Sequence, residues 1–265
     1  MHFSPSFFRA NLPSSLLLAS SLCLLGCSAA VAPGVSSISV TGNWQLSSTA
    51  SAAARLPQLS GALTGSGSAI SGIFHADSAS ACVSPSTPIP VTGSANAQNA
   101  ITLTGASLAG GILTVTGTLA SDGKSIANAA YNVAGGTCAF AAAAPATAQV
   151  YASIDGTYAG SFSDSTGIVV GVTAQLTQTP GSDTDGNFQL SGTGNFNNPC
   201  FTNPVQISNS QVTGGSFTLT YADSKTLNTV VVSGTFSTSG QTLTVTAWTL
   251  TGPCGPDQGT GLLSQ

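Results

Sequence analysis

The chain has 265 residues, of which 8 are acidic, all of them Asp, and 4 are Lys or Arg, so the formal charge is −4. So few cations exclude a basic nucleic-acid-binding surface, because that affinity comes mainly from Lys and Arg that neutralise phosphates. Glu is absent and Met occurs once, while Gly, Ser, Thr and Val are abundant. This composition favours strands over helices.

Residues 1–26 form a predicted signal peptide. Arg9 precedes an apolar run at residues 16–25, which is too short to cross a hydrocarbon layer of about 30 Å as a helix. A basic start, a short apolar core and small residues at the end are typical of secretory signals. We therefore expect the chain to be exported from the cytoplasm.

The end of this leader, Leu24-Leu25-Gly26-Cys27, resembles the lipobox of bacterial lipoproteins. The resemblance implies cleavage before Cys27 and attachment of acyl chains such as palmitate to that residue. Each buried CH₂ then contributes roughly 0.8 kcal/mol to membrane anchoring. Ser28 follows Cys27, and in that family a residue other than Asp there implies outer-membrane cargo. The alternative is an ordinary cleaved signal in which Cys27 is incidental.

Residues 27–40 comprise the lipidated Cys and a predicted flexible tether, because they are small, uncharged and interrupted by Pro33-Gly34. The rest of the chain contains an internal repeat with a period of about 116 residues. The matched pairs are Gly42-Asn43-Trp44 with Gly156-Thr157-Tyr158, Cys82 with Cys200, 101–104 with 217–220, Tyr131 with Trp248, and Cys138 with Cys254. We predict two homologous domains, residues 41–145 and 152–257, with the Ala-rich stretch 141–149 as the join.

Each copy has the pattern of antiparallel β-structure. Phe217, Leu219 and Tyr221 alternate with Thr, which predicts one buried and one solvated face. Turn signals such as Asp122-Gly123 separate the runs. We expect an all-β protein with about seven or eight strands per copy, arranged as a small barrel or a sandwich. The alternation shifts phase near Trp248, which predicts a bulge or burial on both faces.

Four cysteines follow Cys27, and four cysteines allow three pairings. The duplication favours one disulfide per copy, Cys82 with Cys138 and Cys200 with Cys254. Export favours disulfides, which persist in oxidising compartments. Free or metal-binding thiols are the alternative, but no C-x-x-C pair occurs and one His remains after the leader.

Catalytic chemistry has few candidate side chains. His75 is the single histidine available for a Ser-His-Asp triad, and no G-x-S-x-G motif occurs. The Asp residues mostly flank Gly or Ser, so we interpret them as turn formers rather than paired catalytic acids. The stretch 183–187 is the one acidic cluster, but it lacks the Gly and Glu of an EF-hand. We expect no catalytic residues, no metal and no cofactor.

The Gly42-Asn43-Trp44 motif at the first expected strand resembles the G-x-W of lipocalins and avidin-like barrels. The resemblance implies a Trp that closes the floor of a barrel, and an enclosed cavity for a small apolar ligand. The aromatics Trp44, Tyr131, Tyr158 and Trp248 are therefore either core residues or ligand contacts. An exposed platform formed by several of them would indicate stacking on glycans.

These observations predict a bacterial cell-envelope lipoprotein that acts as a non-enzymatic binding or structural module, held on the outer membrane through Cys27. Its neutral, hydroxyl-rich surface favours glycans or other envelope proteins as partners and excludes nucleic acid. Carriage of a small apolar ligand in a lipocalin-like cavity is the alternative. An Asp-dependent hydrolase is a third and more remote class.

Overall fold

The computed structural model describes residues 34–48, 58–80, 82–105 and 108–265, with the side chains of 141 and 142 left out. The expected leader, the predicted lipidation site Cys27 and the cation Arg55 lie outside these residues. Within the described part of the chain, no helix is long and apolar enough to cross a membrane. All the named elements are β-strands.

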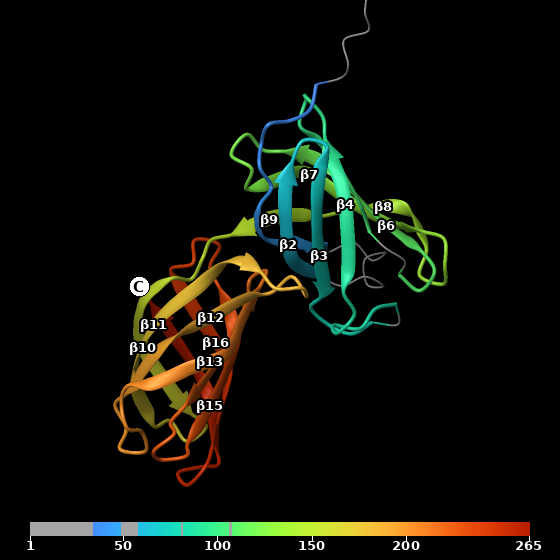
Figure 1. Ribbon diagram of the computed structural model, residues 1–265. Coiled ribbons are helices and arrows are strands. Elements are labelled where there is room, and N and C mark those ends of the chain that lie inside the picture. Colours follow the sequence, from blue (N-terminus) through green and yellow to red (C-terminus); the bar gives the residue numbers. More distant parts are fainter. Residues whose placement is uncertain (1–33, 49–57, 81, 106–107) are drawn as a thin grey trace, which may run out of the picture. The chain divides into compact units, whose positions relative to one another are not determined.

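The first copy is a barrel of antiparallel strands. Its strands are β1 (Gly42–Ser47), β2 (Leu59–Ser66), β3 (Ala69–Ala76), β4 (Ile89–Ala95), β5 (Ala100–Gly105), β6 (Ile112–Leu119), β7 (Ser125–Ala134), β8 (Phe140–Pro145) and β9 (Thr147–Tyr151). Strands β1 to β6 pair in chain order, β9 pairs with β1, and β7 pairs with both β6 and β9 (Figure 1). These pairings close a ring of eight strands, and β8 pairs with the remaining length of β7.

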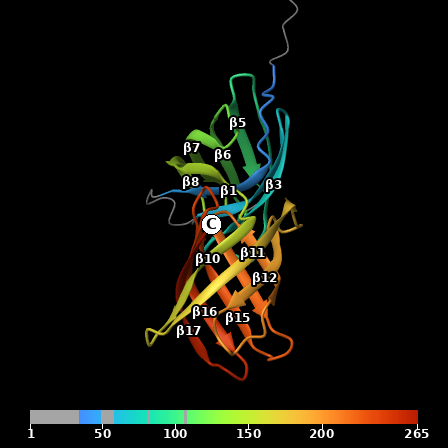
Figure 2. The ribbon, with the colours of Figure 1, turned by 90° about the vertical axis from the view of Figure 1, so that its left-hand side faces the viewer.

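The second copy is a closed barrel with simpler connections. Its strands are β10 (Gly156–Asp164), β11 (Val169–Ser182), β12 (Phe188–Phe196), β13 (Val205–Thr213), β14 (Ser216–Ala222), β15 (Thr229–Phe236), β16 (Thr242–Thr251) and β17 (Asp257–Ser264). Each strand pairs with the next, and β17 returns to β10. The strands run obliquely across this barrel in Figures 1 and 2, as closure of a sheet requires.

The prediction of an all-β chain with two tandem antiparallel domains is confirmed, and each domain is a barrel rather than a sandwich. The alternating pattern that led to this prediction works as expected. In β14, Phe217, Leu219 and Tyr221 are buried, whereas Thr218 and Thr220 are not. Because side chains on a strand alternate between faces, one face fills the barrel and the other meets solvent.

Large apolar side chains fill each barrel. The core of the first barrel includes Trp44, Leu46, Leu59, Phe74, Ile89, Leu103, Leu113 and Tyr131. The core of the second includes Tyr158, Phe162, Phe196, Phe217, Leu219, Tyr221, Trp248 and Leu263. An eight-stranded barrel is just wide enough for side chains to fill its interior, and aromatic residues occupy much of that space here.

The two predicted disulfides are confirmed. Cys82 bonds to Cys138 and Cys200 to Cys254, with Cα–Cα distances of 5.5 Å and 6.0 Å. In each barrel the bond joins the loop after the third strand to the loop after the seventh. Each barrel therefore has one covalent bridge at an equivalent end.

The barrels extend beyond the domain ends given by the sequence. The Ala-rich stretch 141–149, expected as a join, forms most of β8 and the start of β9, and β17 continues to Ser264. Ala has low β propensity, so its composition did not indicate a strand; long-range pairing with β7 and β1 decides its conformation. The described part of the expected tether, residues 34–40, also lies along the first barrel, where the N–H of Val40 donates to Gly65.

Candidate functional site

The four aromatic residues singled out in the sequence are buried core residues. Trp44, Tyr131 and Tyr158 are at most 1% exposed, and Trp248 is 6% exposed. None of them contributes to an exposed aromatic platform. The core interpretation therefore holds for all four, and Trp248 has only a small exposed area, at the base of a surface hollow.

Trp44 and Tyr158 occupy matching positions on the first strand of each barrel, and the polar atom of each side chain donates a hydrogen bond to a backbone carbonyl oxygen. Trp44 Nε1 donates to the carbonyl oxygen of Val40 at 2.6 Å, and the Tyr158 hydroxyl donates to that of Gly240. Each bond satisfies a buried donor, as aromatic residues with a polar atom require in a core. Both residues therefore have a structural role at the start of their barrel.

The phase shift predicted at Trp248 is a β-bulge. The register between β16 and β17 shifts between Val245 and Trp248, and β15 against β16 shifts beside it. Trp248 stacks on Phe162 inside the barrel, with ring centroids 6.0 Å apart and an interplanar angle of 19°. Its Nε1 donates to the carbonyl oxygen of Thr260 at 3.1 Å. The bulge thus keeps the indole inside the barrel, with its polar atom bonded to the neighbouring strand.

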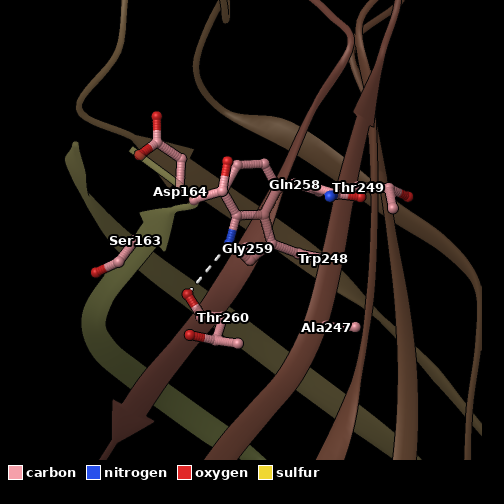
Figure 3. Close-up of a pocket in the computed structure, with 9 residues that line it drawn as sticks. Ser163, Asp164, Ala247, Trp248, Thr249, Gln258, Gly259 and Thr260 are labelled. Atoms are coloured by element: carbon pink, nitrogen blue, oxygen red, sulfur yellow. Dashed lines mark hydrogen bonds between the residues drawn. The ribbon is translucent and has the colours of Figure 1, made fainter. Parts of the chain in front are cut away.

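A hollow of about 350 Å³ opens on the outer surface over this bulge (Figure 3). Strands β10, β16 and β17 and the residue after β10 contribute its lining: Ser163, Asp164, Ser165, Ala247, Trp248, Thr249, Gln258, Gly259 and Thr260. We call this the Trp248 hollow. In Figure 3, Asp164 lies to one side of the Trp248 ring, and Gln258 and Thr249 lie to the other.

Small residues form part of the lining of the Trp248 hollow. A Cβ on Gly259 would lie 1.9 Å from the carbonyl oxygen of Ser163, so no larger residue fits there without displacing β10. Ala247 adds only a methyl group beside it. Bulges and strand glycines often mark places where another molecule approaches the backbone. Gly259 therefore allows β17 to lie close to β10 beside the hollow.

Asp164 has a fixed carboxylate at this rim. Its Oδ1 accepts hydrogen bonds from the N–H groups of Thr166 and Ile168, at 2.8 Å and 2.7 Å, and the Thr166 hydroxyl also donates to it. Partial desolvation opposes ionisation, but these hydrogen bonds outweigh it and hold the pKa of Asp164 below its ordinary value. Asp164 is therefore an ionised acceptor in a defined orientation.

A second hollow, of about 450 Å³, lies over β10, β11 and β12. Two of its three amide side chains are already bonded. Asn203 pairs with both backbone groups of Phe196, at 2.8 Å and 2.9 Å, and Asn195 donates to Thr173 at 3.4 Å. Most of the amide groups of this hollow are therefore used inside the protein.

The predicted turn-forming role of Asp is confirmed at Asp122, Asp164 and Asp183, whereas Asp77 accepts hydrogen bonds from the side chains of Gln45 and Gln58 instead. Asp122 and Asp183 each accept hydrogen bonds from backbone N–H groups two residues further on, both at 2.9 Å. Asp183 also accepts from the Gln189 amide at 2.8 Å. The acidic stretch 183–187 thus uses its first carboxylate to shape a hairpin, and the described residues contain no group of three or more His, Cys, Asp or Glu placed to hold a metal.

His75 lies near the end of β3, with Nδ1 3.0 Å from the carbonyl oxygen of Pro85. In a Ser-His-Asp triad Nδ1 donates to the carboxylate of the Asp, so a backbone carbonyl oxygen in that place does not supply the third group of a triad.

The sequence analysis missed a network that holds the disulfide end of the second barrel. Asp223 accepts hydrogen bonds from the N–H groups of Thr202 and Lys225, and these bonds lower the pKa of Asp223 to about 2. Asn228 donates to the carbonyl oxygen of Cys200 at 2.7 Å and accepts from the N–H of Cys254 at 3.1 Å. The loop 223–228 is thereby tied to both halves of the disulfide.

The sequence contained part of the signal for the Trp248 hollow and none for this network. The phase shift marked Trp248, but the rim residues Asp164 and Gln258 come from strands distant in sequence. The Asp223 and Asn228 contacts also depend on tertiary pairing. Comparisons with protein-family models, with curated proteins and with solved structures found no match to this chain.

Proposed function

We propose that the chain is a lipid-anchored protein of the bacterial cell envelope whose two barrels form a rigid, non-enzymatic binding and structural module. The Leu24-Leu25-Gly26-Cys27 motif supports the anchor. The two disulfides support an oxidising location outside the cytoplasm, because thiols are kept reduced in the cytosol. The outer membrane is the location that Ser28 favours.

The filled interior of both barrels is the observation that carries the module interpretation. A carrier of the lipocalin type keeps the centre of its barrel open for a ligand. Here Trp44, Phe74 and Tyr131 fill one barrel, and Tyr158, Tyr221 and Phe217 fill the other. Carriage of an apolar ligand remains the alternative function, and the density of these cores counts against it.

Native mass spectrometry tests module against carrier. The full chain is purified from its host membranes in a mild detergent, without refolding, and its mass is measured with and without denaturation. A module gives the same mass in both states, equal to the processed polypeptide and its acyl chains. A carrier gives a larger native mass that returns to the polypeptide mass on unfolding, and that result contradicts the proposal.

Metabolic labelling tests the anchor. Cells that express the chain are grown with an alkyne-tagged palmitate, and the labelled protein is detected after a click reaction. Label and membrane association are expected to be lost in Cys27→Ala and kept in Cys23→Ala, a matched control because Cys23 lies in the leader that is removed. Equal labelling of Cys27→Ala and the unchanged chain contradicts the anchor.

A further inference from the structure

His75 lies where one barrel contacts the other. Residues 34–265 form one compact unit, in which the hairpin between β11 and β12 of the second barrel meets β3 of the first. A Cβ on Gly186 in this hairpin would lie 2.6 Å from the carbonyl oxygen of Ile73, so the hairpin and the strand are closely packed. His75 belongs to the same strand, is half-buried, and is the one histidine outside the predicted leader.

Both ring nitrogens of His75 face backbone carbonyl oxygens. Nδ1 lies 3.0 Å from the oxygen of Pro85 in its own barrel, and Nε2 lies 2.5 Å from the oxygen of Asp185 in the second barrel. A carbonyl oxygen accepts hydrogen bonds but donates none. Neutral imidazole has one N–H, so one nitrogen lone pair would point at an oxygen, whereas imidazolium donates from both nitrogens. Both hydrogen bonds therefore form only when the ring is charged.

The charged groups around His75 are acids. Among the described residues, the elements that contact His75 carry Asp77, which follows β3, and Asp183 and Asp185 of the hairpin. Desolvation opposes ionisation of Asp183, but backbone hydrogen bonds outweigh it and lower its pKa. Burial raises the pKa of Asp77 to about 6, so this carboxyl changes its charge in the same range as histidines do. An effect of pH at this contact must therefore be assigned between His75 and Asp77.

A second contact between the barrels does not titrate and reports on their separation. The Asn43 amide donates to the carbonyl oxygen of Gly214 at 2.7 Å and accepts from the Gly214 N–H at 2.6 Å. Asn43 is 3% exposed. Because the Gly214 N–H bonds across the interface, its exchange with solvent requires the barrels to part at this point.

We propose that His75 is a pH-dependent link between the two barrels, in which its imidazolium joins Pro85 of the first barrel to Asp185 of the second. Histidine is the side chain whose charge changes between about pH 5 and 8. Loss of the proton removes one of the two hydrogen bonds, so the barrels are held more tightly in mild acid than above neutral pH. The inference adds regulation to the module proposed above, and it depends neither on the lipid anchor nor on the ligand.

Hydrogen exchange of the full chain in detergent micelles, followed by NMR, tests the inference. The protection factor of the Gly214 amide is measured at about pH 5 and about pH 7.5, after correction for the intrinsic effect of pH on exchange. We expect it to fall about tenfold at the higher pH, because one charge-assisted hydrogen bond is lost. The Gly240 amide donates to Ser237 within the second barrel, so its protection factor should stay constant and verify the fold.

Variants assign the effect to His75. His75→Gln carries no charge at either pH, so the Gly214 protection factor should be the same at both. Asp77→Asn is the matched control, because it removes the neighbouring carboxyl that also titrates in this range, and it should keep the tenfold change. The inference is wrong if the unchanged chain shows no change with pH, if His75→Gln keeps the change, or if Asp77→Asn abolishes it. Because palmitate labelling and native mass are measured separately, these outcomes leave the anchored module standing.

Discussion

The two barrels reach the same packing with large and small residues exchanged. In the first barrel, Phe74 pairs with the first residue of β4, and Gly105 pairs with the third. At the equivalent positions of the second barrel, Gly194 pairs with the first residue of β13, and Tyr221 with the third. The aromatic side chain has moved from one strand to another, and glycine has moved the opposite way.

The exchange shows that the volume of the core is maintained while its sequence changes. A Cβ on Gly194 would lie 2.4 Å from the ring of Tyr221, so the ring occupies the space that a side chain on β12 would take. Cores tolerate such changes when total volume is kept. Both copies keep their barrels filled by different means, which supports a filled interior as a property that the protein retains.

The barrels also close differently. In the second barrel, β17 pairs with β16 and β10 along most of its length. In the first, the equivalent segment is divided at Ala146 into β8 and β9, and β7 meets β9 only at Ser125 and Ile126. The closure of the first barrel is therefore less regular, although its core and its disulfide match those of the second.

Loss of a disulfide gives the largest effect we expect. The double variants Cys82→Ser/Cys138→Ser and Cys200→Ser/Cys254→Ser each lower the free energy of unfolding by about 4 kcal/mol, because the bonds constrain unfolded loops of similar length. The sequence separations are 56 and 54. Denaturant titration without reductant measures both. If the free energies of unfolding fell by clearly different amounts in the two double variants, the two disulfides would not stabilise their barrels equally.

The next largest effect is expected at the core pair of Gly194 and Tyr221, where glycine and an aromatic residue are exchanged relative to the first barrel. Gly194→Ala is expected to lower the free energy of unfolding by about 2 kcal/mol, because the new methyl group displaces the Tyr221 ring. Gly105→Ala is the matched change in the first barrel and should cost less, since its nearest neighbours are side-chain atoms of Leu113 and Ile89 at 3.1 Å or more. Urea denaturation compares the two, and equal losses would contradict the volume argument.

Tyr221→Phe is expected to raise the free energy of unfolding by about 1 kcal/mol. The Tyr221 hydroxyl is fully buried and finds no hydrogen-bond partner among the described residues, and burial raises its pKa. Tyr158→Phe is the control with the opposite sign, because it removes the bond to Gly240. Thermal unfolding followed by circular dichroism measures both. A fall in stability for Tyr221→Phe would show that its hydroxyl is bonded in the folded protein.

The smallest expected effect comes from Leu227→Gly, which should raise the free energy of unfolding by about 0.5 kcal/mol. Leu227 lies two residues before β15 with φ +59°, and it is 71% exposed. Gly110 lies two residues before β6 with φ +85°. A left-handed conformation costs roughly 1–2 kcal/mol for a residue with a Cβ, partly offset by the greater freedom of Gly in the unfolded chain. Gly110→Leu should lower the free energy of unfolding. Calorimetry measures both variants. A loss of stability for Leu227→Gly together with a gain for Gly110→Leu would show that the two loops are not equivalent.

The sequence predicted the features that repeat and missed the features that depend on distant strands. The constant spacing indicated both domains, and the matched cysteines indicated both bridges. The phase shift at Trp248 indicated the bulge from local alternation alone. The closing strand in the Ala-rich stretch 141–149 was missed because pairing with β1 and β7 overrides a weak local preference. The rim of the Trp248 hollow was missed because Asp164 and Gln258 meet only through barrel closure.

A crystal structure of the chain purified from its host membranes tests the central claim most directly, at a resolution that shows individual side chains. We expect continuous electron density for Trp44, Phe74 and Tyr131 in the first barrel and for Tyr158 and Tyr221 in the second, with side chains alone occupying both interiors. Density for an acyl chain or another apolar molecule inside either barrel would contradict the account and establish a carrier.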